Sequence, residues 1–402
     1  MARNSPNGRQ RSRNRASQAW SHLDGAALRT LLTRALAAYS PSYEEQPVLR
    51  VFAERLAQAG LATEWQPVPP PAGRVDPADA DPAGPESRGN LLVRLGPQPP
   101  AMLWVGHVDT IEAVSPFQPP RQDGDRLHGL GAADMKSGCA AMVEAAIALQ
   151  QSGIPLVRGL CLALVVGEEE YGDGALALMD AVRAPITVVG EPTDLLPCIA
   201  HNGYLECQLT AQGNRAHAAV PEVGANAIHA MLAWLMALYD EFLAPPLAGQ
   251  AVLNPREIQG GSTLFAVPAE CRAMVDLHWR PGTDRQLVLE AIERARRSAS
   301  AGHPLCALAS SVTFSSMGYE NPVGDPRLAP FWRACELSGI RPVPALFRSH
   351  SDAAVFQRSG SLAVVCGPGR LEMAHSAEEW VSLEQTEKAA RLYAALACEA
   401  LA

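Results

Sequence analysis

Four short apolar runs punctuate the chain, and each of them ends in or just before a glycine. The runs are residues 101–106, 160–166, 186–190 and 362–367. Their length and the glycine, proline and polar residues around them predict buried strands rather than helices. Strong helix formers lie between the runs, as in residues 139–149. This alternation predicts an α/β domain with a mostly parallel sheet flanked by helices.

The chain before these runs is predicted to be mainly helical. Leucine and valine recur at helical spacing from residue 23 to residue 61, and Ser40-Pro41-Ser42 divides this segment into two helices. Residues 67–88 are rich in Pro, Ala, Gly and Asp, which predicts an exposed loop. Residues 90–95 form a further apolar run, and we expect a strand there that pairs with the strand at residues 101–106.

Residues 203–317 follow a different pattern. They are predicted to form a small α+β domain of ferredoxin-like type, in the order strand, helix, strand, strand, helix, strand. These elements are residues 204–211, 225–243, 266–268, 271–279, 284–298 and 312–316. Because the apolar run at residues 362–367 returns to the first sheet, we expect the small domain to be inserted into a larger one made of residues 21–202 and 318–402.

Composition narrows the class of protein. The chain has 402 residues, a net charge of −9 and no apolar run long enough to cross a membrane. These features argue against binding to nucleic acid or to a membrane. None of the nine cysteines forms a Cys-x-x-Cys pair, which indicates free thiols in a reducing, cytoplasmic compartment. Residues 1–20 are rich in Arg, Asn and Ser, and we expect a disordered basic tail there.

Imidazole and carboxylate groups follow the predicted strands at their carboxyl ends, where open α/β sheets bind ligands. These donors, with an aspartate that precedes the helix at residues 139–149, are His107, Asp109, Asp134, Glu168, Glu169, Glu191 and His375. Singly they have simpler interpretations, such as a helix cap for Asp134. As a set without thiolate they suit zinc, or manganese and cobalt. The set exceeds the needs of one four-coordinate ion, which predicts two ions that share a bridging carboxylate.

Five short motifs occur in the order seen in one known family. They are Gly106-His-Val-Asp-Thr110, Gly131-Ala-Ala-Asp-Met-Lys-Ser-Gly138, Gly167-Glu-Glu-Glu170, Gly190-Glu-Pro-Thr193 and Ala374-His-Ser376. Through them the chain, from about residue 25 to its C-terminus, resembles the dinuclear-zinc amidohydrolases and peptidases. That family includes acetylornithine deacetylase, succinyl-diaminopimelate desuccinylase, aminoacylase and glutamate carboxypeptidase.

The resemblance implies a role for each metal donor. His107 and Glu191 would bind one zinc ion. Glu169 and His375 would bind the other, and Asp134 would bridge the two. Cobalt or manganese would suit the same ligands.

The same resemblance assigns the groups around the ions. Asp109 would orient the imidazole of His107, as carboxylates do for metal-bound histidine. Glu168 would be the general base, which takes a proton from water and later gives it to the leaving amine. The peptide bond between Asp134 and Met135 would be cis.

The inserted domain resembles the lid and dimerisation domain of the family, which predicts a homodimer through residues 203–317. His217 would reach the active site of the neighbouring subunit, and Arg280 would grip a substrate carboxylate. The alternatives are a surface histidine and an arginine paired with Asp276. Phe265 stands where many members have asparagine, so the substrate contact at this position is open.

These features predict a zinc-dependent hydrolase that cleaves the amide bond of a small N-acyl-amino acid, as acetylornithine deacetylase and succinyl-diaminopimelate desuccinylase do. A metallo-carboxypeptidase of the glutamate carboxypeptidase type, or a dipeptidase, is the alternative. A metal-binding protein without hydrolase activity is a lesser alternative, and Glu168 beside the ligands argues against it. A last alternative treats the inserted domain as a partner-binding module on a scaffold.

Overall fold

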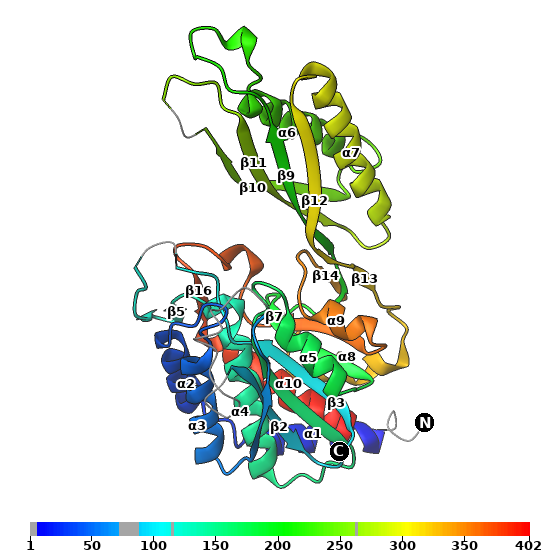
Figure 1. Cartoon of the computed structure of the whole chain (residues 1–402). Helices are drawn as coiled ribbons and strands as arrows, with labels where there is room; N and C mark the ends of the chain where they lie inside the picture. Colours follow the sequence, from blue (N-terminus) through cyan, green and yellow to red (C-terminus); the bar gives the residue numbers. More distant parts are fainter. Residues whose placement is uncertain (1–5, 72–87, 114–115, 262–263) are drawn as a thin grey trace. The chain divides into compact units, whose positions relative to one another are not determined.

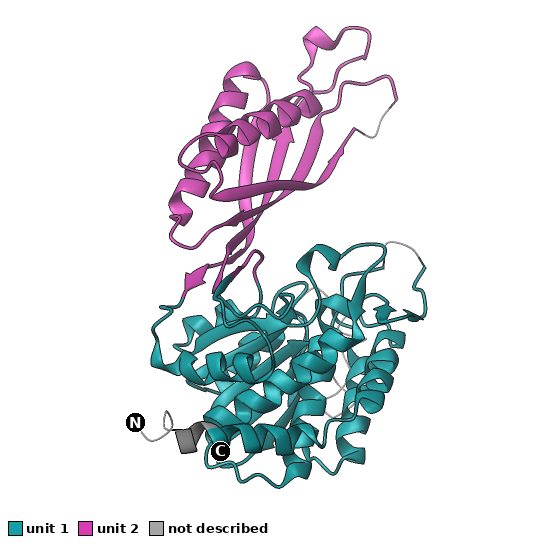
Figure 2. Ribbon diagram, turned by 180° about the vertical axis from the view of Figure 1, so that it is seen from behind, with its two compact units in different colours: residues 1–199, 321–345, 351–402 teal, residues 200–320, 346–350 magenta. Residues whose placement is uncertain are grey.

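The computed structural model describes residues 6–71, 88–113, 116–261 and 264–402 (Figure 1). The chain forms two compact units (Figure 2). Unit 1 comprises residues 1–199, 321–345 and 351–402, and unit 2 comprises residues 200–320 and 346–350. Most of the predicted loop at residues 67–88 lies outside the described residues.

The largest sheet has nine strands. They are β1 (Thr63–Pro67), β2 (Gly89–Leu95), β3 (Pro100–His107), β6 (Gly159–Val165), β7 (Ile186–Pro192), β8 (Cys198–His201), β13 (Tyr319–Glu320), β14 (Ala345–Phe347) and β15 (Leu362–Gly367). The order is β1-β2-β6-β3-β7-β15-β8-β13, with β14 beside β8. The central strands β6, β3, β7 and β15 are parallel. The pairs β1–β2, β2–β6, β15–β8 and β8–β13 are antiparallel. The four apolar runs form these central strands, which are almost wholly buried because helices flank the sheet.

The expected pairing of residues 90–95 with residues 101–106 is wrong. Strand β6 lies between β2 and β3, antiparallel to the first and parallel to the second. The chain leaves β3, passes through helix α4 (Ser137–Ser152) and returns beside β3 as β6, which is the usual strand–helix–strand crossover. Because β6 is apolar along its whole length, it occupies an interior position of the sheet, between β2 and β3. Direct pairing of β2 with β3 would have left no such position.

Helices surround this sheet. Besides α4 they are α1 (Pro6–Trp20), α2 (Gly25–Ala37), α3 (Gln46–Gln58), α5 (Asp173–Ala181), α8 (Ala329–Leu337), α9 (Ala353–Arg358) and α10 (Leu383–Leu401). Helices α4 and α10 contact each other and are buried over most of their length. No helix in the described part of the chain is long and apolar enough to cross a membrane.

The disordered tail predicted for residues 1–20 is wrong for residues 6–20, which form helix α1. The helix packs against α4 and α10, and its small residues Ala16 and Ala19 are fully buried. The side chain of Gln18 donates to the Ser152 carbonyl at 2.8 Å, and the Trp20 indole donates to the Arg391 carbonyl at 2.9 Å. The composition of this segment did not indicate a helix, because the helix is stabilised by tertiary packing of a few small residues rather than by an apolar stripe.

Unit 2 is a four-stranded antiparallel sheet with two helices. Its strands are β9 (Gly203–Gln212), β10 (Ala251–Gly260), β11 (Glu270–Trp279) and β12 (Ala307–Ser316), in the order β10-β11-β9-β12. Helices α6 (Ala227–Leu243) and α7 (Arg285–Gly302) pack together and against the sheet (Figure 1). The alternating buried positions of β9 and β11 form the core with these helices.

The strand predicted at residues 266–268 is wrong, and strand β10 was not predicted. Residues 266–268 contribute only an isolated bridge, between Ala266 and His217. Strand β10 is an edge strand that contains Pro255 and exposes most of its residues. Edge strands tolerate proline and need no apolar alternation, so the hydrophobic pattern gave no signal for β10.

A third, small sheet lies at the edge of unit 1. Its strands are β4 (Arg121–Asp123), β5 (Arg126–His128) and β16 (Trp380–Ser382), in the order β16-β5-β4. Short helical turns complete the chain, namely η2 (Ala132–Lys136), η3 (Pro221–Val223), η4 (Pro326–Leu328) and η5 (Leu371–Met373). Turn η2 contains Asp134, and strand β16 begins shortly after His375.

Candidate metal centre

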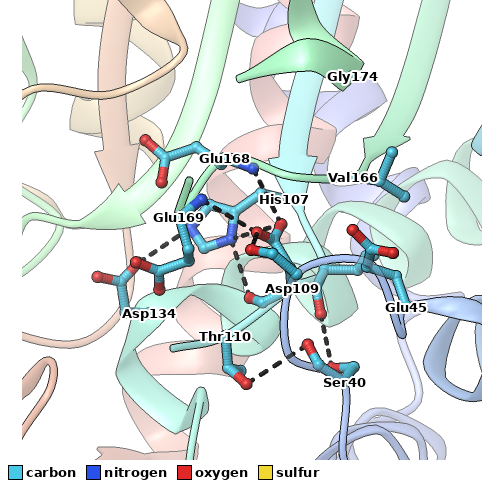
Figure 3. A network of polar contacts seen from close by, with 12 residues as sticks. Ser40, Glu45, His107, Asp109, Thr110, Asp134, Val166, Glu168, Glu169 and Gly174 are labelled. Carbon is cyan, nitrogen blue, oxygen red and sulfur yellow. Dashed lines mark hydrogen bonds and ion pairs between the residues drawn. The ribbon is translucent and has the colours of Figure 1, made fainter. Parts of the chain in front are cut away.

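The parallel strands deliver polar side chains to one edge of the sheet (Figure 3). His107 is the last residue of β3, and Asp109 follows it. Glu191 lies in β7, and Glu168 and Glu169 follow β6. Because the carboxyl ends of parallel strands meet at the same edge, these side chains converge, as the sequence predicts.

His107 contacts three of the other residues in this group. Its Nε2 atom lies 3.1 Å from Asp134 Oδ1 and 3.7 Å from Glu191 Oε1. Its Nδ1 atom faces Asp109, 3.1 Å from the carbonyl oxygen and 3.6 Å from carboxylate Oδ1. One ring nitrogen therefore faces the donor cluster, and the other faces a group that fixes the ring.

His375 approaches from the opposite side of Asp134. Its Nε2 atom lies 3.2 Å from Glu169 Oε2 and 3.6 Å from Asp134 Oδ2. The two oxygens of Asp134 thus face two different imidazoles, His107 through Oδ1 and His375 through Oδ2. This is the arrangement that a carboxylate shared between two ions would need.

The donor chemistry fits a metal. Ligand atoms of His107, Asp134 and Glu169 all lie within 4.8 Å of one another. Glu191 Oε1 is buried without a hydrogen-bond partner, which is costly for a carboxylate that no cation satisfies. Nitrogen and oxygen donors without thiolate suit zinc, cobalt or manganese.

Asp109 ties three chain segments together. Its carboxylate accepts hydrogen bonds from the backbone N–H groups of Glu168 at 3.2 Å and Glu169 at 3.0 Å. It also accepts the hydroxyl of Ser42 at 2.7 Å. The sequence indicated Ser42 only as part of the break between two helices, so its contact with the site was missed. A serine between two helices carries no sequence pattern that indicates contact with a distant carboxylate.

Electrostatics separate the pKa values of the titratable groups. Burial, with the nearby charge of Asp134, raises the pKa of Glu191 to about 8. Burial would also raise the pKa of Asp134, but its hydrogen bond with His107 lowers that pKa to about 2. Burial opposes protonation of His375, yet the hydrogen bond to Glu169 raises its pKa to about 9. Burial, reinforced by neighbouring carboxylates, raises the pKa of Glu168 well above the ordinary glutamate value.

The turn that carries Asp134 has an unusual backbone. The Asp134–Met135 peptide is cis, as the resemblance implies. Glu379, which the sequence did not single out, accepts hydrogen bonds from three backbone N–H groups of this turn. The only signal was its place in the same short segment as His375.

The residues predicted on the inserted domain all belong to unit 2, whereas the metal donors all belong to unit 1. His217 Nδ1 accepts the Ala219 N–H at 3.1 Å. Phe265 is 76% exposed, and its φ of 58° lies in the left-handed region that bulky residues rarely adopt.

Arg280 follows β11, and its backbone N–H donates to the Gln250 carbonyl at 2.8 Å. Asp276, the partner considered for Arg280, instead accepts the Tyr204 hydroxyl at 3.0 Å and lies 3.8 Å from Arg256. The guanidinium of Arg280 is thus not paired with Asp276 in the described structure.

Comparison with known proteins extends these observations. A profile described as peptidase family M20/M25/M40 matches residues 103–399. An acetylornithine deacetylase from Myxococcus xanthus is 30% identical over 379 residues, covering 89% of this chain and 93% of that protein. A probable succinyl-diaminopimelate desuccinylase from Staphylococcus epidermidis is 28% identical over 342 residues, covering 74% and 82%. The dipeptidase Dug1p from Saccharomyces cerevisiae shares the fold, with a TM-score of 0.76 at 14% identity over 96% of this chain and 98% of that one.

Proposed function

This chain belongs to peptidase family M20/M25/M40 and hydrolyses amide bonds, and we propose that its substrate is a small N-acyl-amino acid. The relatives named acetylornithine deacetylase and succinyl-diaminopimelate desuccinylase support this substrate class. The structural observation that carries the proposal is the Asp134 carboxylate, whose oxygens face His107 and His375. Such a pair of imidazoles around one carboxylate favours a two-ion hydrolase over a scaffold protein.

The proposed cofactor is a pair of zinc ions, for which cobalt or manganese would substitute. His107 and Glu191 would hold one ion, and Glu169 and His375 the other. Asp134 would be shared. When bound, the ions would supply Lewis acidity, which would lower the pKa of a water molecule toward ~7 and polarise the amide carbonyl.

Glu168 is the proposed general base. Its backbone is fixed by the bond to Asp109, and desolvation raises the pKa of its carboxyl group above the ordinary glutamate value, which makes it a stronger base. Glu168 takes the proton of the attacking water and then delivers it to the leaving nitrogen, so that the products are a carboxylate and an amine. Asp109 acts indirectly, by orienting His107 and the backbone of Glu168.

The inserted domain is the proposed lid and dimer contact. Leu232, Met236, Tyr239 and Leu243 are 38–75% exposed on helix α6 at spacings that place them on one face. Monomers rarely expose such a contiguous apolar face, and a homodimer through residues 203–317 would cover it. In this dimer His217 would serve the active site of the partner.

Arg280 is the proposed grip for the substrate carboxylate, since its guanidinium is not committed to Asp276. The compartment is proposed to be the cytoplasm because all nine cysteines are free and buried. Phe265 stands where the family resemblance implies an asparagine, and it would favour a substrate with an apolar group.

Hydrolysis of a substrate panel tests the proposal. The zinc-loaded protein is assayed with N-acetyl-, N-succinyl- and N-formyl-amino acids and with α- and γ-glutamyl peptides, then after chelation and again after zinc is restored. We expect chelator-sensitive turnover of N-acyl-amino acids. Turnover of peptides alone would favour the carboxypeptidase or dipeptidase alternative. No turnover by protein that holds two zinc ions would contradict the proposed reaction.

A further inference from the structure

Glu379 is a buried carboxylate that stands outside the proposed metal ligands. It lies four residues after His375 and directly before strand β16, and it is 4% exposed. Its Oε1 atom accepts the backbone N–H groups of Ala133 at 2.8 Å and Asp134 at 3.0 Å. Its Oε2 atom accepts the N–H of Gly131 at 2.9 Å.

The backbone of the same segment is fixed against the same turn. The Glu379 carbonyl accepts the Gly129 N–H at 3.1 Å, and Trp380 pairs with His128 where β16 meets β5. Glu379 is therefore held by its main chain and its side chain at once. The segment that carries His375 and the turn that carries Asp134 form one bonded assembly.

The far side of the turn is held by another element. Lys136 is buried, and its Nζ atom donates to the carbonyls of Ala35 at 3.2 Å and Ala38 at 3.0 Å at the end of helix α2. The turn between Gly131 and Lys136 is thus anchored at both ends. With its backbone N–H committed to Glu379, Asp134 directs its carboxylate to His107 and His375.

We propose that Glu379 is a positioning residue of the metal centre, which aligns Asp134 with His375 by binding the backbone of the Asp134 turn. The proposal rests on the proposed function, because it takes Asp134 and His375 as ligands. Three backbone N–H groups donate to the two oxygens of this one side chain, so Glu379 ties Gly131, Ala133 and Asp134 together. The two ligands lie on segments 241 residues apart (375 − 134), and Glu379 links those segments through its own bonds.

A residue that only stabilises the fold would predict a different outcome from a positioning residue. Loss of a structural bond lowers the unfolding temperature and leaves the affinity of a correctly folded site for metal unchanged. Loss of alignment lowers metal affinity and changes the ligand geometry in protein that remains folded. Partners of metal ligands typically contribute about 10–100-fold in metal affinity.

The experiment compares Glu379→Gln with Glu379→Asp and with Glu378→Gln, a matched change at the exposed neighbour. Zinc affinity is measured by chelator competition on the full chain, and circular dichroism checks the fold of the metal-free protein. The visible spectrum of the cobalt-loaded protein reports ligand geometry. Gln retains one acceptor oxygen and presents an NH₂ group to a backbone N–H, so at least one of the three bonds is lost.

We expect Glu379→Gln to weaken zinc binding by about 10–100-fold and to change the cobalt spectrum, while Glu378→Gln matches the wild type. Glu379→Asp, which keeps the charge on a shorter side chain, should recover part of the affinity. Zinc affinity and a cobalt spectrum equal to those of Glu378→Gln would overturn the proposal.

Two further outcomes keep the test decisive. If Glu379→Gln does not fold, Glu379→Asp takes its place, and wild-type affinity in that variant would overturn the proposal. If the wild type binds no metal, the proposed centre fails together with this role. If the wild type binds zinc without hydrolysing the panel, the proposed function fails and the affinity comparison still decides the role of Glu379.

Discussion

Asp109 accepts the backbone N–H of Glu169 at 3.0 Å, so a residue that follows β3 fixes the start of the loop that follows β6. The same carboxylate lies 3.6 Å from His107 Nδ1. A proposed ligand on each of two neighbouring strands is thus oriented by one buried group. Asp109 therefore couples the positions of His107 and Glu169, although it is not itself a proposed metal ligand.

Replacing Asp109 should therefore weaken both halves. In Asp109→Asn the side chain keeps a single acceptor oxygen, so it cannot satisfy Glu168, Glu169 and His107 as the carboxylate does. We expect zinc affinity and turnover to fall by about 10–100-fold, measured by chelator competition and by kcat/KM. Ser42→Ala removes one bond to the same carboxylate and leaves the two backbone N–H bonds in place, so we expect zinc affinity to fall less than in Asp109→Asn. Equal effects of the two changes would contradict the coupling role.

Glu168 should be needed for chemistry and dispensable for metal binding. Glu168→Gln preserves size and removes the proton acceptor, so kcat is expected to fall by about 10²–10⁴-fold with zinc affinity unchanged. Glu170→Gln, a change two residues away at an exposed position, is the control and should leave kcat near the wild-type value. Glu168→Gln protein that binds zinc normally and turns over at the wild-type rate would remove the general-base assignment.

The convergence of the donors could be predicted from the sequence because it depends on strand ends. His107, Glu168 and Glu191 follow or end apolar runs, and parallel strands bring such ends to one edge. The central strands and the inserted sheet were predictable for the same reason, since burial leaves an apolar pattern. Asp134 could be predicted as a metal ligand only from the family motif, because an aspartate before a helix is usually a helix cap.

The parts that were not predicted depend on contacts that have no local pattern. Ser42 meets Asp109 across 67 residues, and Glu379 meets the Asp134 backbone across 245 residues. Strand β10 is mostly exposed at the edge of its sheet, so its sequence shows no alternation of apolar and polar residues. Helix α1 depends on two buried alanines in a basic segment. In each case tertiary packing, and not propensity or periodicity, decides the outcome.

Zinc binding should strengthen as pH rises. In the metal-free protein the pKa of Glu191 is raised to about 8 and that of His375 to about 9, so both are largely protonated near pH 6. Metal ligands bind in their deprotonated forms, so at a pH below 8 binding must release the protons of Glu191 and His375. His107, whose pKa is raised as well, would add to this release. Apparent affinity should rise about tenfold per pH unit for each proton released.

Calorimetric titration in two buffers of different ionisation enthalpy measures that release, and chelator competition over the same pH range measures the affinity. Asp134 supplies the internal contrast, because its pKa is lowered to about 2 and it contributes no proton in this range. An affinity that stays flat between pH 6 and pH 9, after correction for the chelator, would contradict the raised pKa values.

The exposed face of α6 should carry the dimer. Leu232 and Met236 are 49% and 63% exposed one helical turn apart, so Leu232→Glu and Met236→Glu would place charge inside the proposed contact. We expect a dimer for the wild type and a monomer for the double variant in sedimentation velocity. Val157→Glu, at a 64% exposed apolar position of unit 1, is the matched control and should remain dimeric. A wild-type monomer at micromolar concentration would exclude the proposed contact.

The proposed role of His217 in the partner's active site predicts that two inactive chains restore each other. A heterodimer of His217→Ala and Glu168→Gln chains, purified through two different tags, has one site with an intact Glu168 and an intact His217 from the partner subunit. It should show about half of the wild-type activity, because one of its two sites is complete. A heterodimer of wild-type and Glu168→Gln/His217→Ala chains should be inactive, since neither site receives both groups. If His217 instead served its own subunit, the two results would be exchanged, so this pair of heterodimers distinguishes the partner's site from the chain's own.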